Sequence, residues 1–213
     1  MRTGFVRKGV ALGGLTVAAI AVAATLGLAA PAKAAGCTYG STSQVFLPWL
    51  DVNNYFLAPG ANFESGLGNW SASGGAAIVS GNEPNNVGGA GSNSLSLPTT
   101  SATATTPVFC VSLDAPTFRV FVKNNGANGM YDGQLAVYLN FENTSGKWQQ
   151  VKIAAVKTGN TGWNLTLPIS FIQYISTPLT HQGYANVSFT FKPNDNHGNW
   201  QIDDMYVDPC LSK

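Results

Sequence analysis

The sequence contains 213 residues, with 11 basic and 10 acidic side chains and a formal net charge of +1. The first 34 residues carry four of the basic side chains and none of the acidic ones, so the other 179 residues have a net charge of about −3. Such a domain lacks the basic surface that neutralises phosphates, which disfavours a nucleic-acid-binding function. The apolar content of the full sequence, 45%, excludes a disordered chain, and the length of the domain suffices for one substantial core.

The N-terminus has the composition of a secretory signal peptide. Three basic residues precede an uncharged Ala-, Val- and Leu-rich run over residues 10–30, and Ala32-Lys33-Ala34 matches a small-x-small cleavage site. We therefore expect residues 1–34 to be removed, and residues 35–213 to form a single secreted, extracellular β-sandwich domain without a membrane anchor. Two alternatives stay open, namely retention of the apolar run as an anchor and lipid attachment at Cys37.

The chain contains three cysteines, Cys37, Cys110 and Cys210. Disulfides persist outside the cell, so two of these cysteines are expected to pair. No C-x-x-C or Cys/His spacing indicates a zinc or redox site. Spacing alone does not select the pair; we favour Cys37–Cys110 over Cys110–Cys210.

Short alternating segments, broken by Gly, Asn, Pro and Ser, follow the leader. In residues 117–123, for example, Phe118, Val120 and Val122 occupy alternate positions and share one face of a strand. About ten such segments without amphipathic helices predict an all-β fold, an antiparallel β-sandwich or barrel. The clearest predicted strands are residues 94–97, 117–123, 135–141, 148–153, 165–169, 187–191 and 202–207.

Two segments between these strands have a different composition. Residues 81–93 are rich in Asn and Gly and are expected to form a long loop. Residues 171–176 are expected to form no more than one short helical turn. No internal repeat or domain boundary is visible.

Two motifs at opposite ends of this region carry a family resemblance. The first is Asn62-Phe63-Glu64-Ser65-Gly66, followed by Trp70, and the second is Trp200-Gln201-Ile202-Asp203-Asp204. With Gly91-Ser92-Asn93-Ser94-Leu95, they resemble motifs of jelly-roll carbohydrate-binding modules with a galactose-binding-like fold. Over residues 37–210 the chain is also similar to a group of secreted actinobacterial proteins without an assigned activity. That similarity is carried by four segments: Phe46-Leu47-Pro48-Trp49, Gly81-Asn82-Glu83-Pro84, Pro116-Thr117-Phe118-Arg119 and Asp204-Met205-Tyr206-Val207-Asp208-Pro209. The resemblance implies a jelly-roll β-sandwich, although a fold of this kind hosts many functions.

The resemblance also implies a structural Ca²⁺ ion held by carboxylates near the first and last strands. Glu64 and Asp203 occupy the matching positions, and Ca²⁺ prefers carboxylate and carbonyl oxygens. Alternation along a strand places Asp204 on the face opposite Asp203, so only Asp203 is expected to be a ligand. The alternative is that Glu64 and Asp203 accept hydrogen bonds from backbone amides.

Sugar binding requires exposed aromatic rings. We predict Trp148, Trp163 and Tyr131 as ligand-binding residues, because they stand at strand starts or on a loop. Trp70 and Trp200 belong to the family-like motifs and are expected in the core.

Residues for catalysis are sparse. The chain has no Gly-x-Ser-x-Gly, H-E-x-x-H or phosphate-loop motif, and its carboxylates are scattered. Arg119, the only arginine after the leader, is expected to pair with Asp114 or to bond loop carbonyls. We therefore predict a secreted non-catalytic β-sandwich that binds carbohydrate or another extracellular polymer. The alternatives are a cell-envelope jelly roll that contacts another protein, and a small polysaccharide-acting enzyme.

Overall fold

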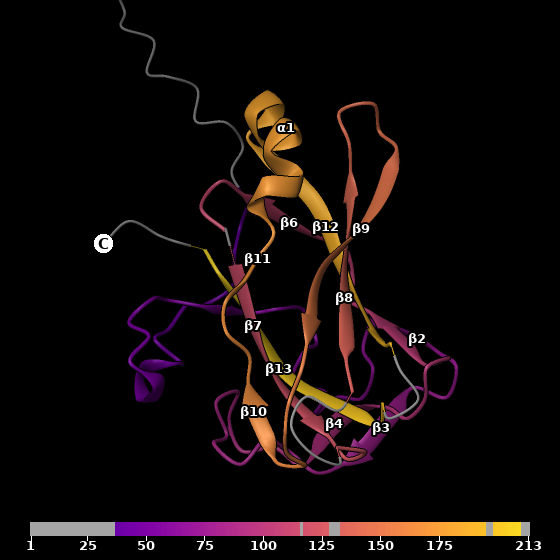
Figure 1. Cartoon of the computed structure of the whole chain (residues 1–213). Coiled ribbons are helices and arrows are strands. Elements are labelled where there is room, and N and C mark those ends of the chain that lie inside the picture. The colour runs from indigo at the N-terminus through magenta and orange to yellow at the C-terminus, as the bar shows by residue number, and fades with distance from the viewer. Residues whose placement is uncertain (1–36, 116, 128–132, 195–197, 210–213) are drawn as a thin grey trace, which may run out of the picture. The chain divides into compact units, whose positions relative to one another are not determined.

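A computed structural model describes residues 37–115, 117–127, 133–194 and 198–209 (Figure 1). In these residues the chain forms a seven-stranded and a six-stranded sheet, and all strand pairs are antiparallel. The predicted antiparallel β-sandwich is therefore confirmed. The signal peptide with its cleavage site, Tyr131 and Cys210 lie outside the described residues.

One sheet is built around β13 (Trp200–Asp208), and we call it the β13 sheet. Its main strand order is β10 (Trp163–Leu165), β7 (Thr117–Asn124), β13, β4 (Asn93–Leu97) and β3 (Ala77–Ser80). Two short strands lie beside this order: β1 (Phe56–Leu57) pairs with β13, and β11 (Ile169–Ser170) pairs with β7.

The other sheet is built around β12 (Tyr184–Pro193), and we call it the β12 sheet. β6 (Phe109–Ser112) pairs with β12 beside the main order. That order is β2 (Ser71–Ser73), β5 (Thr103–Thr105), β12 (Tyr184–Pro193), β8 (Leu135–Glu142) and β9 (Trp148–Val156). The chain passes repeatedly from one sheet to the other, for example from β4 to β5, from β7 to β8 and from β12 to β13, as in a jelly roll.

The predicted strands agree with the observed ones except at residues 165–169. There the chain forms β10 and β11 separately, joined by a link that contains Pro168. Proline cannot donate to the ladder, so a single continuous strand is interrupted. The link is held by Thr166, whose amide donates to the Val120 carbonyl at 3.1 Å and whose hydroxyl accepts from the Val120 amide at 3.1 Å.

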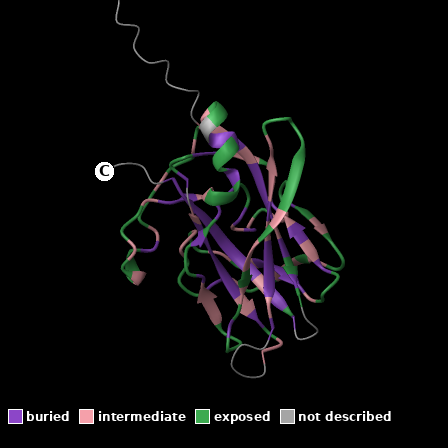
Figure 2. Cartoon of the chain, turned by 45° about the horizontal axis from the view of Figure 1, so that its top comes forward, coloured by how far each residue is buried: buried purple, intermediate pink, exposed green. Residues whose placement is uncertain are grey.

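The main core lies between the inner faces of the two sheets, where Figure 2 shows buried strands. Phe118 from the β13 sheet meets Phe189 from the β12 sheet, with 4.7 Å between ring centroids. Trp70 and Trp200 are buried in this core, as predicted. The predicted long loop is also observed, over residues 81–92.

The prediction of only a short helical turn near Phe171 is wrong. Helix α1 extends over Ile172–Gln182 and contains Pro178 in its interior. Burial of Phe171, Ile175 and Leu179, which recur every four residues on one face, compensates for the missing proline N–H. Within the described residues no helix combines the length and apolar composition needed to cross a bilayer.

A second, smaller cluster lies on the opposite face of the β13 sheet. The N-terminal segment, residues 43–57, places Phe46 and Tyr55 against Phe121 and Tyr206. The short 3-10 helix Leu47–Trp49 belongs to this segment.

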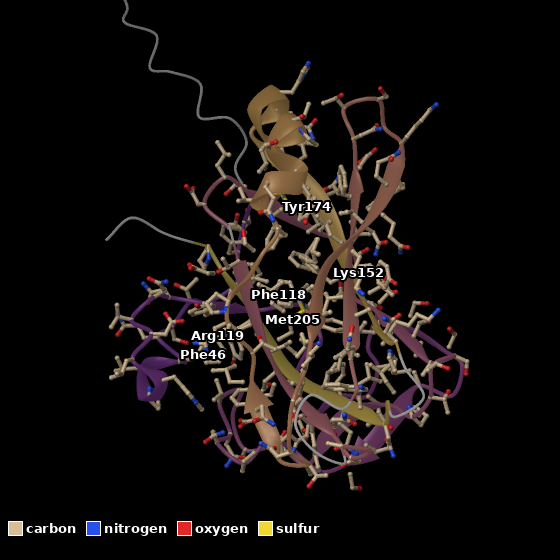
Figure 3. All side chains as sticks on the ribbon, viewed as in Figure 1. Phe46, Phe118, Arg119, Lys152, Tyr174 and Met205 are labelled. Atoms are coloured by element: carbon tan, nitrogen blue, oxygen red, sulfur yellow. A yellow bond between two sulfur atoms is a disulfide. The ribbon has the colours of Figure 1, made fainter. Side chains whose placement is uncertain are left out.

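Arg119 connects the N-terminal segment to the sheet. Its guanidinium pairs with Asp51 at 3.0 Å, donates through Nε to the Thr166 carbonyl at 2.9 Å, and lies 4.9 Å from the Phe46 ring centroid. Figure 3 shows Phe46 and Arg119 side by side. The prediction that Arg119 bonds a loop carbonyl is confirmed. The prediction that Asp114 is its ion-pair partner is wrong, because the N-terminal segment places Asp51 beside the guanidinium.

The favoured Cys37–Cys110 disulfide is present, with a Cα–Cα distance of 5.5 Å. It joins the start of the described chain to β6 across a sequence separation of 73 residues. A crosslink over so long a loop removes conformational freedom mainly from the unfolded chain.

Reduction of this disulfide should lower the free energy of unfolding by about 2–5 kcal/mol. Urea unfolding with and without a phosphine reductant measures the difference, and a Cys37→Ser/Cys110→Ser variant should lose as much without reductant. Cys210→Ser serves as the control and should unfold like the wild type. Coincident unfolding curves for the reduced and oxidised proteins would contradict the prediction.

Candidate functional site

The β12 sheet has one face in the core and one face turned away from it. In β8, Val137 and Leu139 are buried in the core, while Tyr138 and Asn140, which follow them in turn, are half-buried. This alternation is typical of an antiparallel sheet with one solvated face. We call the outward side chains of β8, β9 and β12 the polar face: Tyr138, Asn140, Glu142, Trp148, Gln150, Lys152, Asn186, Ser188, Thr190 and Lys192.

Strand register aligns these side chains in rows across the sheet. Neighbours in a row lie directly opposite each other in paired strands, so their side chains are close enough to interact. Three rows follow one another along the strands: Trp148–Glu142, Gln150–Asn140–Ser188 and Lys152–Tyr138–Thr190.

Asn140 is the centre of a hydrogen-bond network in the middle row. Its amide Nδ2 donates to Ser188 Oγ at 3.2 Å and to Thr190 Oγ1 at 3.0 Å. Its Oδ1 accepts from Gln150 Nε2 at 2.7 Å. The network extends from the exposed Gln150 through the half-buried Asn140 and Thr190 to the buried Ser188.

Aromatic rings lie at both ends of this network. Trp148 is 49% exposed, so about half of the indole surface is open to a ligand. Tyr138 is half-buried in the third row. From Tyr138 to Glu142, which is opposite Trp148, there are four residue steps along β8, or about 13 Å at the usual strand rise.

The structure does not bring the predicted ligand-binding residues together. Trp148 lies on the polar face, whereas Trp163 is in β10 of the other sheet and packs against the Phe46 cluster. The two tryptophans therefore cannot serve one site, and Tyr131 lies outside the described residues.

Sequence reasoning missed Tyr138, Asn140 and Gln150. Alternation in residues 135–141 could have shown that Tyr138 and Asn140 face away from the core. Only the register of β8 with β9 and β12 reveals that they share a surface with Trp148.

A cavity of about 450 Å³ lies beside the C-terminal end of β9. Residues 154–159 line one side of it and residues 164–169 line another. Its lining, drawn from the described residues, contains no aromatic ring, so it does not offer the stacking surface found on the polar face.

A separate group of acidic side chains surrounds the loop of residues 81–92. Asp203 accepts hydrogen bonds from the amides of Glu83 at 3.0 Å and Asp204 at 2.9 Å, and Asp204 accepts from the amide of Gly88 at 2.8 Å. A bulge in β13 and a φ of 46° at Asp204 turn both aspartates toward this loop. The expectation that Asp204 faces away from Asp203 is wrong, because strict alternation fails at a bulge.

Glu64 lies against the C-terminal end of the same loop. Its Oε1 accepts from the amides of Ser92 at 2.9 Å and Asn93 at 2.8 Å. Glu83, within the loop, is fully buried and accepts from two amides of the loop itself. We call Glu64, Glu83, Asp203 and Asp204 the acid cluster.

Some oxygens of the acid cluster are free to bind a cation, and others already accept hydrogen bonds. Backbone amides occupy oxygens of Glu64 and Asp203, which matches the alternative to a metal site. Asp204 Oδ1, however, is buried without a hydrogen-bond partner, and a Cβ at Gly88 would overlap it. No group of three or more His, Cys, Asp or Glu side chains suited to a metal ion is found among the described residues.

Burial disfavours the ionised form of Asp203 and of Asp204. It raises the pKa of Asp203 to about 8 and that of Asp204 to about 6, and nearby carboxylates add to both shifts. The only ion pair among the described residues is Arg119–Asp51, so no basic side chain pairs with the acid cluster.

Comparison with known proteins gives only distant similarities. No protein-family model matches the chain, and the search of curated proteins found no match. The CBM22-1 and GH10 modules of Clostridium thermocellum endo-1,4-β-D-xylanase 10B, solved with xylohexaose, are 14% identical with a TM-score of 0.47, covering 70% of this chain and 27% of theirs. The CBM22-1 xylan-binding domain of Paenibacillus barcinonensis Xyn10C is 15% identical with a TM-score of 0.46, covering 70% and 90%. A CBM61 module bound to β-1,4-galactotriose is 18% identical with a TM-score of 0.36, covering 71% and 96%. TM-scores below 0.5 carry no inference about function.

The raised pKa values predict a pH dependence of stability in metal-free buffer. Between pH 4 and the raised pKa values, the folded protein retains protons that the unfolded chain has released. The free energy of unfolding should therefore fall as the pH rises from about 5 to about 8. Urea unfolding at fixed ionic strength measures this slope. Asp203→Asn should flatten it, whereas stability that rises over this range would contradict the prediction.

Proposed function

We propose that this protein is a secreted, non-catalytic β-sandwich that binds carbohydrate chains on its polar face. The observation that carries the proposal is the half-exposed Trp148 next to a fixed network of amides and hydroxyls around Asn140. The apolar face of a pyranose ring can pack on an indole, while its hydroxyls exchange hydrogen bonds with amide side chains.

The spacing of the rings indicates a chain rather than a single sugar. Trp148 and Tyr138 are about 13 Å apart along the strands, which is longer than one pyranose ring. A ligand that contacts both must contain several sugar units. Side chains of the middle row would then meet the hydroxyls of the units between the two rings.

Glu142 can contribute to binding beside Trp148. It lies directly opposite Trp148 and its Oε2 accepts from Asn186 Nδ2 at 3.2 Å. A carboxylate oriented in this way is a strong acceptor for a sugar hydroxyl.

We also propose that Ca²⁺ binds at the acid cluster. The support is the accumulation of carboxylates without a paired basic side chain in the described residues, together with the unpartnered Asp204 Oδ1. Glu64 and Asp203 are the residues expected from the sequence, and the bulge adds Asp204. A bound dication would neutralise these groups and stabilise the loop of residues 81–92.

Removal of Trp148 should separate binding from folding. Trp148→Ala and Tyr138→Ala should each weaken polysaccharide binding about fivefold, the equivalent of about 1 kcal/mol for a stacked ring. The melting temperature of Trp148→Ala should change little, because the ring is already half exposed. Affinity electrophoresis in gels that contain xylan, β-1,4-galactan or polygalacturonate measures the binding.

Two other tryptophans provide matched controls. Trp163→Ala should leave binding unchanged, and Trp200→Ala should destabilise the fold by about 3–5 kcal/mol. A wild-type protein that binds no polysaccharide would refute the carbohydrate proposal and favour a protein contact in the cell envelope.

The calcium proposal predicts a response to chelation. EGTA should lower the melting temperature, and added Ca²⁺ should restore it. At a free Ca²⁺ concentration one hundred times Kd, the ion should raise the free energy of unfolding by about 2.7 kcal/mol. Asp204→Asn and Asp203→Asn should reduce the response, while the exposed Asp114→Asn should not. Melting curves unaffected by EGTA would rule the ion out without affecting the polar face.

A further inference from the structure

The lysines of the described chain are unevenly distributed over the two sheets. Four of the five, Lys147, Lys152, Lys157 and Lys192, lie in or beside the strands of the polar face, and all four are exposed. The fifth, Lys123, is in β7 of the β13 sheet. This asymmetry occurs in a domain whose net charge is about −3 after the leader.

A bulge in β9 sets the orientation of two of these lysines. Val137 pairs with Ala154 and Tyr138 pairs with Lys152, so Ile153 is the extra residue. Lys152 therefore shares the outward side with Tyr138, and Ala155 shares it beyond the bulge. Lys157, two residues after Ala155, follows at the end of β9 and lines the cavity there.

Lys192 approaches the same place from the other side of Tyr138. It is opposite Ala136, which is opposite Ala155, in the row next to that of Tyr138. The two alanines are too small to cover the lysine side chain. Tyr138 thus has Lys152 in its own row and Lys192 in the next one, and Figure 3 shows Lys152 on β9.

These lysines are not neutralised by carboxylates of the described residues. The single ion pair in that part of the chain is Arg119–Asp51, which belongs to the N-terminal segment and the β13 sheet. On the polar face the carboxylate is Glu142, four residues from Tyr138 along β8. Among the described residues, the charged side chains nearest to Tyr138 on this face are therefore the two lysines.

We infer that the polar face selects acidic polysaccharides, whose sugar units carry carboxylates, and this inference rests on the proposed carbohydrate binding. A uronic acid ring that packs on Tyr138 would direct its carboxylate to the ammonium group of Lys152 or Lys192. Lysine ammonium groups on flexible stems can reach such a carboxylate, and a charge-assisted hydrogen bond is stronger than a neutral one.

Pairs of polymers that differ only in charge test the selection. Glucuronoxylan is compared with its carboxyl-reduced form, and polygalacturonate with its methyl ester, by affinity electrophoresis of the full mature protein. At least one charged polymer should bind about fivefold more tightly than its neutral partner, the gain of one exposed ion pair. The preference should shrink as salt is added, because ions screen exposed charges.

Variants locate the selection on the polar face. Lys152→Met and Lys192→Met keep the apolar stem, and at least one of them should lose most of the preference, so that the charged and the neutral polymer bind with similar affinities. Lys123→Met, on the other sheet, is the matched control and should keep the preference. Inorganic polyphosphate, which has charge but no sugar ring, should compete weakly, and Tyr138→Phe should retain the selection.

Each result has a distinct meaning. Equal binding of charged and neutral polymers would overturn the selection for acidic sugars but leave carbohydrate binding intact. Polyphosphate that competes as well as polyuronate would also overturn it, because the lysines would then attract any polyanion. Absence of binding to every polymer would refute the proposed function itself.

Discussion

The packing of the N-terminal segment on the β13 sheet determines which surface of the sandwich is available. Phe46 and Tyr55 cover Phe121 and Tyr206, and Arg119 fixes this arrangement through Asp51, Thr166 and the Phe46 ring. One sheet is thereby covered by apolar contacts on both faces, while the β12 sheet keeps its outward face for polar side chains. A ligand that needs rings and amides together finds them on the β12 sheet, because the tryptophan on the other side, Trp163, contributes to packing.

Charge follows the same division. The acid cluster lies where β13 meets the loop of residues 81–92, and its oxygens fix that loop through backbone amides of Glu83, Gly88 and Ser92. The exposed lysines lie on and beside the polar face. The charges of the two sheets therefore have different settings, since mostly buried carboxylates hold a loop beside one sheet and exposed ammonium groups lie on the polar face of the other. The small net charge of the sequence does not show that acidic and basic groups lie in different places, because their charges cancel in the sum.

The sequence predicted those features that depend on local alternation. Strands such as β7 and β12, the burial of Trp200 and the long loop before β4 are examples. Helix α1 was missed because Pro178 argues against a helix locally, and only burial of Ile175 and Leu179 against the sandwich compensates for it. Arg119 and its partner Asp51 are 68 positions apart in the sequence. A local sequence pattern contains no information about such a contact. The polar face likewise depends on the register of three strands, so Trp148 was found alone.

Two bulges account for the charged positions that alternation could not locate. In β13 the bulge after Asp203 brings Asp204 to the same loop as its neighbour, and burial then raises the pKa of both. In β9 the extra residue Ile153 shifts the alternation by one position beyond Lys152, which directs Ala155 outward and leaves Ala154 and Val156 facing the core. A regular strand would instead have turned Ala154 and Val156 to solvent and lost their packing. The β9 bulge thus keeps Ala154 and Val156 in the core while Lys152 lies on the polar face, so the placement of charge on this face depends on the packing of the sheet.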